Sequence, residues 1–420
     1  MTHVLVAAVG SAGDMYPFLR QARALLARGH RVTFIGVQAH ADAAMAAGVP
    51  FHGLGTEADY LALLSDPDLW HPRRGFGVIW RGMRDSLDLL PDTVAALAAD
   101  GPCVLLAHPL TLPGAALARA RRPGLRIVAA WLAPTNLRSV HDPLLIGPLR
   151  IPRWLPLAWR HALWRRIDAT VIDPVAVPDL NTVRARYGLA PVSHFIDHIE
   201  SVADAHLTLF PRWFAPAPPD WPRPLSEGTF PLYDPFLQET LAPELATFLR
   251  AGSAPIVFTP GSGNRQATRW FERALAATQR LGRRAIFLTS HREQVPARLP
   301  EDVLWLPYVP LRALLPSVAA LVHHGGIGTT AEALRAGVPQ LVVPMAYDQF
   351  DNGARVRALG AGQMLAGWRA RPRTLATTLS RLLDSDAVRA GCARAAALAA
   401  ADAAVEPGPQ LERLLGLASR

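Results

Sequence analysis

Short apolar runs alternate with amphipathic stretches along most of the chain, and glycine-rich turns separate many of them. In the first half, apolar runs predict strands at residues 3–9, 31–36, 103–107, 126–131 and 205–210. Residues 17–28 have the periodicity of an amphipathic helix and follow a glycine turn at residues 10–14. Because apolar strands alternate with helices, the pattern predicts an α/β fold built on a doubly wound parallel sheet.

The second half repeats this organisation after an interval rich in proline. The prolines are Pro211, Pro216, Pro218, Pro219, Pro222, Pro224, Pro231 and Pro235. Neither a helix nor a central strand tolerates that spacing. Strands at 255–259 and 284–289 then flank a helix at 268–281, and the glycine turn at 260–264 echoes the turn at 10–14. We therefore expect an N-terminal domain over 1–212, a linker over 213–243 and a C-terminal domain over 244–404.

The last residues predict two helices separated by a break. An alanine-rich helix is expected over 387–404, Pro407-Gly408-Pro409 interrupts it, and a terminal helix follows over 410–418. We treat residues 405–420 as a separate terminal segment.

Composition indicates a globular chain of more than one domain and argues against nucleic acid as a partner. The 420 residues carry a formal charge of +9, but all 43 basic residues are arginine and they are scattered, so nucleic-acid binding is not expected. Cys103 and Cys392 belong to no metal-binding or disulfide pattern. Neither a signal peptide nor an apolar run of about 18 residues is visible, so we expect a cytoplasmic protein.

The most informative stretch runs from residue 321 to 352. It predicts a strand that ends in the polar glycine loop His323-His324-Gly325-Gly326-Ile327-Gly328, followed by a helix. Such a loop and helix start bind anions through backbone N–H groups. Thr329 and Thr330 can cap the helix, and either His323 or His324 can donate an N–H to a diphosphate oxygen, so no metal would be required.

Three polar residues beyond this loop fit the rest of an activated sugar. Glu332, one turn into the helix, can accept a ribose hydroxyl. Asp348 and Gln349 follow the strand expected at 340–343, at the edge where parallel sheets hold ligands, and can read sugar hydroxyls. In the turn at 260–264, we expect Ser262 to point at the same diphosphate.

The block resembles the donor-binding signature of the nucleotide-sugar-dependent glycosyltransferases that act on lipophilic acceptors. This family includes plant secondary-product, sterol, macrolide and glycopeptide enzymes. Tyr308-Val309 stands where the family's signature opens with an aromatic residue that stacks on the base, although plant members have Trp there. The resemblance implies the GT-B architecture, in which two Rossmann-like domains face each other across a cleft and the last helix returns to the first domain. It also implies a nucleotide-sugar co-substrate and no further cofactor.

The glycine turn at 10–14 supplies the candidate catalytic residue. Asp14 follows the first strand and can accept the proton of an acceptor hydroxyl as general base. Asp14 can also simply cap the following helix, and the two roles are compatible. His108 and Asn136 follow the strands at 103–107 and 126–131 and can line the acceptor pocket, or can serve as ordinary loop residues.

Gly10-Ser11-Ala12-Gly13-Asp14, together with residues 66–70 and 76–80, is most similar to the rhamnosyltransferases of rhamnolipid synthesis. That resemblance implies transfer of L-rhamnose from dTDP-L-rhamnose to a hydroxy-fatty-acid acceptor by an inverting, metal-independent reaction. Those enzymes have Pro at the position of His324, so either histidine can be the diphosphate ligand. A glucosyltransferase of sterol, macrolide or polyketide acceptors, using UDP- or dTDP-glucose, is the alternative. A sugar-nucleotide epimerase and a catalytically silent partner subunit are alternatives of other classes.

Residues 149–167 contain Trp154, Trp159 and Trp164 among five arginines. Such a segment is typical of a helix at a membrane surface. The alternative is a surface helix that packs its Trp and Leu side chains onto the sheet. The sequence leaves open whether this segment contacts a membrane.

Overall fold

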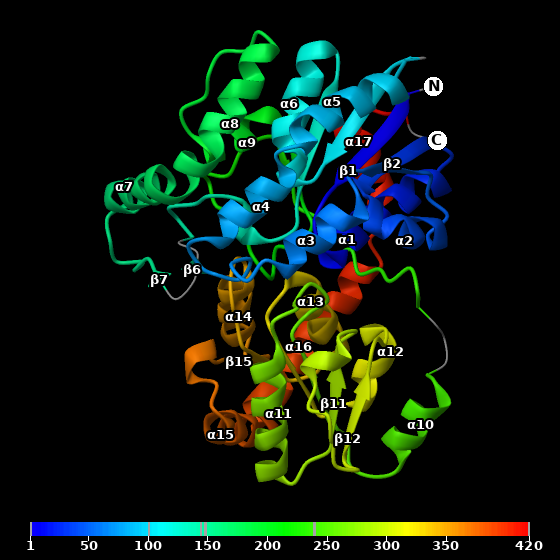
Figure 1. Cartoon of the computed structure of the whole chain (residues 1–420), viewed down its shortest axis with the longest axis vertical. Helices are drawn as coiled ribbons and strands as arrows, with labels where there is room; N and C mark the ends of the chain where they lie inside the picture. Colours follow the sequence, from blue (N-terminus) through cyan, green and yellow to red (C-terminus); the bar gives the residue numbers. More distant parts are fainter. Residues whose placement is uncertain (1, 100, 143–144, 147–148, 238–240, 419–420) are drawn as a thin grey trace. The chain divides into compact units, whose positions relative to one another are not determined.

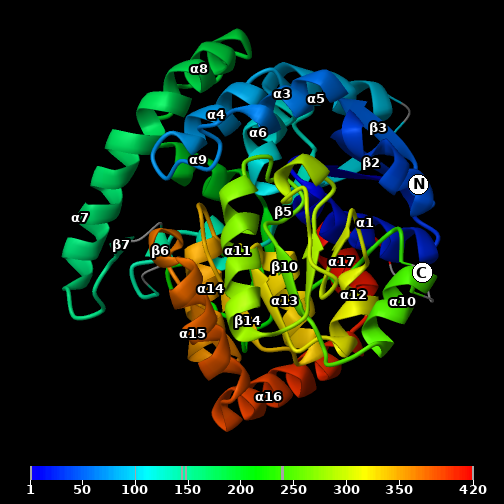
Figure 2. The same ribbon diagram turned by 60° about the horizontal axis from the view of Figure 1, so that its bottom comes forward.

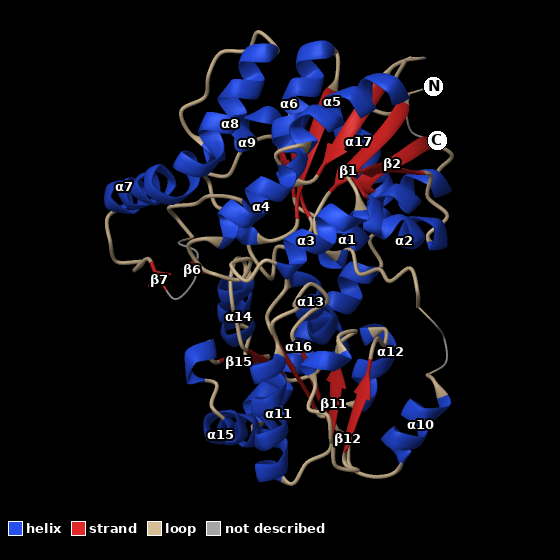
Figure 3. Ribbon diagram, in the orientation of Figure 1, coloured by secondary structure: helices blue, strands red, loops and turns tan. Residues whose placement is uncertain are grey.

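The computed structural model describes residues 2–99, 101–142, 145–146, 149–237 and 241–418. The chain forms two α/β units (Figure 1). The first contains residues 1–144, 149–235 and 405–420, and the second contains residues 145–148 and 236–404. Each unit is built on its own parallel sheet with helices packed around it (Figure 3).

The sheet of the first unit has the strand order β3-β2-β1-β4-β5-β8-β9. Its strands are β1 His3–Ala8, β2 Arg31–Val37, β3 Phe51–Leu54, β4 Cys103–Ala107, β5 Arg126–Trp131, β8 Ala205–Thr208 and β9 Leu225–Ser226. Neighbouring strands pair in parallel, for example His3 with Arg31 and with Cys103. All six residues of β1 are buried, as expected of a central parallel strand covered on both faces.

The helices of the first unit begin and end as follows: α1 Ala12–Ala27, α2 Ala41–Ala46, α3 Glu57–Ser65, α4 Gly75–Met83, α5 Ser86–Leu97, α6 Leu112–Arg121, α7 Leu157–Ile167, α8 Asp173–Arg186, α9 Phe195–Val202 and α17 Pro407–Leu415. A π-helical segment, Asp168–Ile172, joins α7 to α8, so residues 157–186 form one helical run (Figure 2). Two short strands, β6 Leu145–Ile146 and β7 Leu149–Arg150, precede it.

The sheet of the second unit has the order β12-β11-β10-β13-β14-β15, again in parallel. The strands are β10 Ile256–Thr259, β11 Ala285–Leu288, β12 Val303–Leu306, β13 Ala320–His323, β14 Gln340–Val342 and β15 Gly362–Met364. The helices are α10 Pro243–Arg250, α11 Thr268–Leu281, α12 Leu311–Leu314, α13 Ile327–Ala336, α14 Gln349–Ala358, α15 Pro372–Leu383 and α16 Asp386–Ala403. Helix α11 packs on α15, and α13 packs on α16 (Figure 2).

The core of the second unit shows why these strands and helices form. Val257 of β10, Ile286 of β11 and Leu321 of β13 are fully buried and pack with Ala333 of α13. Helices α11 and α13 end at Gly282 and Gly337, which adopt φ angles of 58° and 67°. Only glycine takes this left-handed conformation without strain, so these two residues stop the helices.

Two helix starts differ from the sequence prediction. The first helix was expected from residue 17 but begins at Ala12, because Ser11 is its N-cap and Pro17 is tolerated within the second turn. The terminal helix was expected from residue 410 but begins at Pro407, because Pro is favoured at the first helical position. In both cases the helix begins several residues before the predicted start, and a proline lies within its first two turns.

Buried charged contacts hold the terminal helix α17 within the first unit, where it packs on α1, β4 and β5 (Figure 1). Arg28 donates two hydrogen bonds to the carboxylate of Glu412, at 2.7 and 2.8 Å. His30 Nε2 lies 2.8 Å from Glu412 Oε1. These two residues and Glu412 connect the end of α1 and the start of β2 to the end of the chain. Glu412 is 1 % exposed.

We expect Glu412→Gln to lower the thermal midpoint of the protein in a pH-dependent way. Hydrogen bonds from Arg28 and His30 lower the pKa of Glu412 from 4.5 to about 2. Since the folded pKa is the lower one, this stabilisation is present above pH 4.5 and is lost as the pH falls towards 2. Calorimetric scans should therefore show the largest gap between wild type and variant at neutral pH, closing on acidification. Glu57→Gln, in the exposed first turn of α3, is the control. An equal gap at every pH would contradict the assignment.

Candidate functional site

The first unit brings two polar residues together where its strand order reverses. From β1 the chain builds β2 and β3 on one side and then returns to place β4 on the other side. Ligands of doubly wound sheets bind at such a switch point, beyond the carboxyl ends of the strands. Asp14 follows β1 and His108 follows β4. Their nearest atoms, Asp14 Oδ1 and His108 Nε2, are 3.7 Å apart.

Asp14 is held in the first turn of α1. Its Oδ2 accepts hydrogen bonds from the backbone N–H of Ser11 at 2.7 Å and from the Ser11 hydroxyl at 2.9 Å. Gly10 makes room for this arrangement, since an added Cβ would lie 2.4 Å from Asp14 Oδ2 and the residue has a φ of 127°. Oδ2 of Asp14 is therefore bonded to Ser11 at the start of α1, while 35 % of the surface of the Asp14 side chain is exposed.

The ring of His108 has a defined orientation. Its Nδ1 accepts a hydrogen bond from the backbone N–H of Leu110 at 3.2 Å, so the neutral ring carries its proton on Nε2, which faces Asp14. The edge of Phe18 packs against the ring with centroids 5.5 Å apart. His108 is only 4 % exposed. In this orientation His108 presents a donor to Asp14.

The electrostatic surroundings keep Asp14 ionised. Burial raises the pKa of its carboxyl, but His108 and the hydrogen bonds from Ser11 lower it by more, so the pKa lies below the ordinary 3.8. His40 lies next to the same turn, with Nε2 3.2 Å from the carbonyl oxygen of Gly10. Burial lowers the pKa of His40, so this neighbour is uncharged at neutral pH. A carboxylate at a sheet switch point with one exposed side can accept a proton.

Asn136 lies in the turn after β5 but has a local structural role. Its Oδ1 accepts a hydrogen bond from the backbone N–H of Ala133 at 2.9 Å and closes the turn Pro134–Asn136. The side chain is partly exposed.

The second unit has its own switch point between β10 and β13. The turn after β10 contains Gly261 and the exposed Ser262, and the loop after β13 contains His324 and Gly326. The His324 ring lies between the two glycines. An added Cβ would lie 2.5 Å from the ring at either glycine. The glycines of both turns are therefore required to seat this imidazole.

The two adjacent histidines have different surroundings. His323 is fully buried, its Nδ1 accepts from the N–H of Gly325 at 3.1 Å, and its Nε2 lies 3.0 Å from Gln340 Oε1. Both its ring nitrogens are thus used within the protein. His324 is partly exposed, and its buried Nδ1 has no partner among the described residues. Burial lowers the pKa of His323 to about 3 and that of His324 to about 4, so both are neutral at neutral pH.

The start of α13 lies directly after these histidines. Gly326 is the N-cap and offers no side chain, so Ile327, Gly328 and Thr329 present first-turn N–H groups that have no acceptor within the helix. The prediction that Thr329 or Thr330 caps the helix is wrong, because both lie inside it. The buried hydroxyl of Thr330 has no hydrogen-bond partner in the part of the chain that the structure describes. A neutral histidine beside open helical N–H groups is an arrangement that can hold an anion.

An asparagine that the sequence analysis did not select connects the glycine loop with the residues after β14. Asn352 Nδ2 donates to Asp348 Oδ2 at 2.7 Å and to the carbonyl oxygen of Gly325 at 2.9 Å. Gln349 Oε1 accepts from the N–H groups of Met345 and Ala346 at 2.8 and 3.0 Å. The spacing of four residues between Asp348, the N-cap of α14, and Asn352 within that helix was the available signal, since it places them on the same side.

The remaining candidate residues of the second unit lie directly after β12 or within α13. Tyr308 follows β12 and is 49 % exposed, whereas the side chain of Val309 is buried in the core. Glu332 Oε2 accepts a hydrogen bond from Arg335 at 2.7 Å, one turn further along α13.

Residues that could hold a metal ion do not gather in groups of three or more within the described ranges. In the same ranges, no helix is both long enough and apolar enough to cross a membrane.

Two α/β units, each built on its own parallel sheet with a polar switch point, are the architecture of the GT-B glycosyltransferases. The model of the glycosyltransferase family 28 N-terminal domain matches residues 4–113, and the model of the erythromycin biosynthesis protein CIII-like C-terminal domain matches residues 273–412. The O-mycaminosyltylonolide 6-deoxyallosyltransferase of Streptomyces fradiae is 30 % identical over 381 residues, which cover 84 % of this chain and 82 % of that enzyme.

Two further comparisons agree. The vancomycin aglycone glucosyltransferase of Amycolatopsis orientalis is 29 % identical over 364 residues, covering 86 % of this chain and 84 % of that enzyme. A spinosyn rhamnosyltransferase solved with thymidine diphosphate has a similar fold, with a TM-score of 0.66, 21 % identity and coverage of 98 % of this chain and 100 % of that one. The chain belongs to the GT-B glycosyltransferase family that includes the enzymes of macrolide and glycopeptide antibiotic synthesis.

Proposed function

We propose that the protein transfers a sugar, with inversion, from a nucleotide diphosphate to a hydroxyl of a hydrophobic acceptor, and that L-rhamnose from dTDP-L-rhamnose is the leading donor. The observation that carries this proposal is the pair of switch-point sites, an ionised Asp14 facing His108 in one unit and His324 beside the open start of α13 in the other. The first site fits a general base, and the second fits a diphosphate.

The reaction is a single displacement. The acceptor hydroxyl oxygen forms a bond to the anomeric carbon while Asp14 takes its proton, and the bond from that carbon to the diphosphate oxygen breaks. A bound acceptor would cover the exposed part of Asp14, and the loss of water raises a carboxyl pKa towards the working pH. The charge that develops on the leaving diphosphate is met by first-turn N–H groups of α13 and by Nε2–H of His324. His324 is proposed for this role in place of His323, because both ring nitrogens of His323 have partners within the protein.

Other residues of the second unit are proposed to bind the rest of the donor. Asp348 and Gln349 take sugar hydroxyls, Glu332 takes the ribose, Tyr308 stacks on the base, and the backbone of Val309 contacts its edge. Asn352 keeps Asp348 oriented. A thymine base is supported by the similar spinosyn rhamnosyltransferase solved with thymidine diphosphate.

Two classes of acceptor are proposed, each supported by a different observation. A polyketide, macrolide or glycopeptide hydroxyl is supported by relatives whose names give such substrates, over more than four fifths of their length. A hydroxy-fatty-acid acceptor is supported by the resemblance of residues 10–14, 66–70 and 76–80 to rhamnosyltransferases of rhamnolipid synthesis. The names of these relatives point to the first class of acceptor and not to a fatty acid.

A matrix of donors and acceptors distinguishes these proposals. We expect dTDP-L-rhamnose to react faster than dTDP- or UDP-glucose when each is incubated with a hydroxyacyl chain series and with macrolide and anthracycline aglycones. Products are identified by mass spectrometry, and incubation with donor alone tests the epimerase alternative.

If fatty chains are the acceptors, kcat/KM should rise with acyl chain length, because each buried methylene contributes about 0.8 kcal/mol. A flat length dependence with reaction on aglycones would reject the fatty-acid class. Epimerised donor without transfer would reject the whole proposal.

Removal of divalent metal should leave the activity unchanged. The proposed handling of the diphosphate charge uses only His324 and the N-terminus of α13. Initial rates measured after dialysis against chelator, and again with added magnesium or manganese, provide the test. Loss with chelator and recovery with either ion would show that the diphosphate charge is met differently.

A further inference from the structure

Exposed apolar side chains and one arginine form a surface in the first unit, on the loop before α7 and on that helix. We call this surface the α7 face, and its members are Trp154, Leu157, Trp159, Leu163 and Arg166. Trp154 is 80 % exposed and Trp159 is 69 % exposed. Leu157 and Leu163 are also exposed, at 45 % and 37 %. Two tryptophans turned outward on one short segment are unusual, since large aromatic side chains are normally mostly buried.

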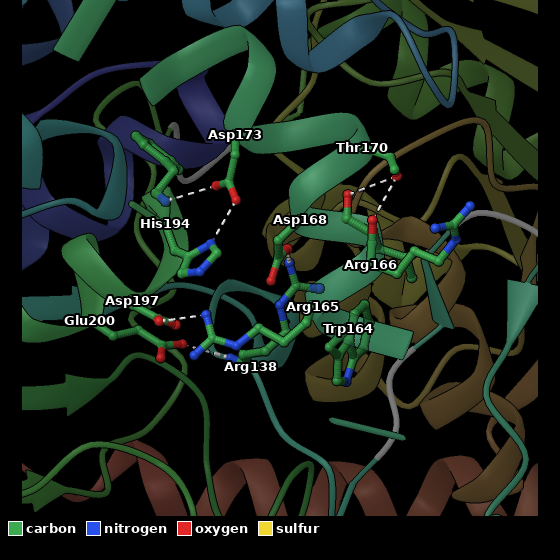
Figure 4. Close-up of polar contacts among 12 residues, drawn as sticks. Arg138, Trp164, Arg165, Arg166, Asp168, Thr170, Asp173, His194, Asp197 and Glu200 are labelled. Atoms are coloured by element: carbon green, nitrogen blue, oxygen red, sulfur yellow. Dashed lines mark hydrogen bonds and ion pairs between the residues drawn. The ribbon is translucent and has the colours of Figure 1, made fainter. Parts of the chain in front are cut away.

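The opposite face of α7 is fixed to the body of the first unit. Trp164 is buried, its Nε1 donates to the carbonyl oxygen of Ser139 at 2.9 Å, and the guanidinium of Arg138 lies 4.0 Å from its ring centroid (Figure 4). Arg138 also bonds Asp168, one turn further along (Figure 4). Arg160 donates to the carbonyl oxygens of Leu155 and Val140, each at 2.7 Å. Because these contacts hold the inner face, the α7 face is presented in a rigid form.

The charge of this segment has one sign. Residues 149–167 contain five arginines and no Asp or Glu. Arg153 and Arg165 bond to Asp142 and Asp197 elsewhere in the unit, at 3.0 and 2.7 Å. Arg166 is exposed, and its side chain extends away from Asp168 and Asp197 (Figure 4). The α7 face thus combines exposed indole rings with basic charge.

We propose that the α7 face binds the surface of an anionic phospholipid bilayer. Indole rings favour the headgroup level of a membrane, where the ring meets acyl chains and the N–H meets water, and arginine binds lipid phosphate. A second copy of this chain is a poorer occupant, because a twofold interface would set this positive face against itself. Binding needs neither donor nor acceptor, so the proposal stands apart from the proposed reaction.

Co-sedimentation with vesicles tests the proposal. The protein of 420 residues should partition onto phosphatidylcholine vesicles containing about 30 mol % phosphatidylglycerol at least about tenfold more strongly than onto phosphatidylcholine alone, and added salt should reduce this binding. Equal partition onto both vesicle types, or no binding to either, would overturn the proposal.

Variants then locate the binding surface. The double variant Trp154→Ser with Trp159→Ser should lose about tenfold or more in the partition coefficient, and Arg166→Gln about fivefold. Trp368→Ser is the matched control, because Trp368 is 74 % exposed in the second unit and should not matter. The substituted side chains are exposed, so unchanged thermal midpoints should confirm that the variants fold.

Undiminished binding by the double variant would overturn the proposal. The proposal would also be overturned if the wild-type protein formed a dimer that does not bind vesicles, and if the double variant were a monomer. That result would show that the α7 face is a protein interface.

Discussion

Asp14→Asn is expected to lower turnover by about 100- to 10,000-fold, the usual contribution of a general base. The amide keeps the size of the side chain, and its oxygen can still accept the hydrogen bonds that Ser11 donates to Asp14 Oδ2 at 2.7 and 2.9 Å. It cannot accept a proton from the acceptor hydroxyl. Donor affinity should stay nearly unchanged, because Asp14 lies in the first unit and the proposed diphosphate site lies in the second.

The test combines steady-state turnover with calorimetric titration of the donor. Asp42→Asn is the matched control, since Asp42 is an exposed carboxylate in the first turn of α2 in the same unit. The pH profile adds a second readout. Because the pKa of Asp14 lies below 3.8 in the free protein, kcat/KM should not decline through loss of this base until the pH falls below that value. Turnover retained within a few fold in Asp14→Asn would remove Asp14 from the mechanism.

His324→Ala is expected to lower turnover by about 100- to 1,000-fold, the range found when one donor to a developing oxyanion is removed. His324 is neutral at neutral pH, since burial lowers its pKa to about 4, so it acts as an N–H donor. Its rate contribution should therefore be constant between pH 6 and 8. The fold should be preserved, because the ring makes no hydrogen bond through Nδ1 to any described residue.

The neighbouring histidine supplies the contrast for this experiment. His323→Ala removes the acceptor for the N–H of Gly325 and the partner of Gln340, which should cost about 1–3 kcal/mol of unfolding free energy. Parallel kinetics and denaturant unfolding of the two variants separate the roles. We expect lost activity with retained stability at position 324, and lost stability at position 323. The reverse result would mean that the diphosphate contact was assigned to the wrong histidine.

Much of the local structure was predictable because it depends on short-range patterns. The helix expected at 268–281 is α11, with the same bounds, and the strand expected at 103–107 is β4. Continuous apolar runs bounded by glycine turns permit few alternatives. Errors occurred where proline was ambiguous. The predicted helix starts at Pro17, which lies inside α1, and the predicted break contains Pro407, which is the first residue of α17.

The three tryptophans of residues 149–167 show a different limit. They recur every five residues, and no sequence pattern states which of them is buried. Contacts with Ser139 and Arg138 bury Trp164, whereas Trp154 and Trp159 remain exposed. Of the three tryptophans, Trp164 alone packs inward, and its partners Ser139 and Arg138 lie in the loop after β5.

By itself, the sequence determined the two α/β halves, the glycine turns and the polar residues at the ends of the strands, because backbone conformation and apolar periodicity are local properties. Only the tertiary structure decided which of those polar residues meet. Asp14 and His108 are far apart in the chain, and the reversal of strand order at β1 and β4 brings them together. Likewise, the burial of His323 against Gln340 leaves His324 as the histidine with a free face. Packing between distant segments fixes burial and hydrogen bonding, and these determine which side chain remains available for chemistry.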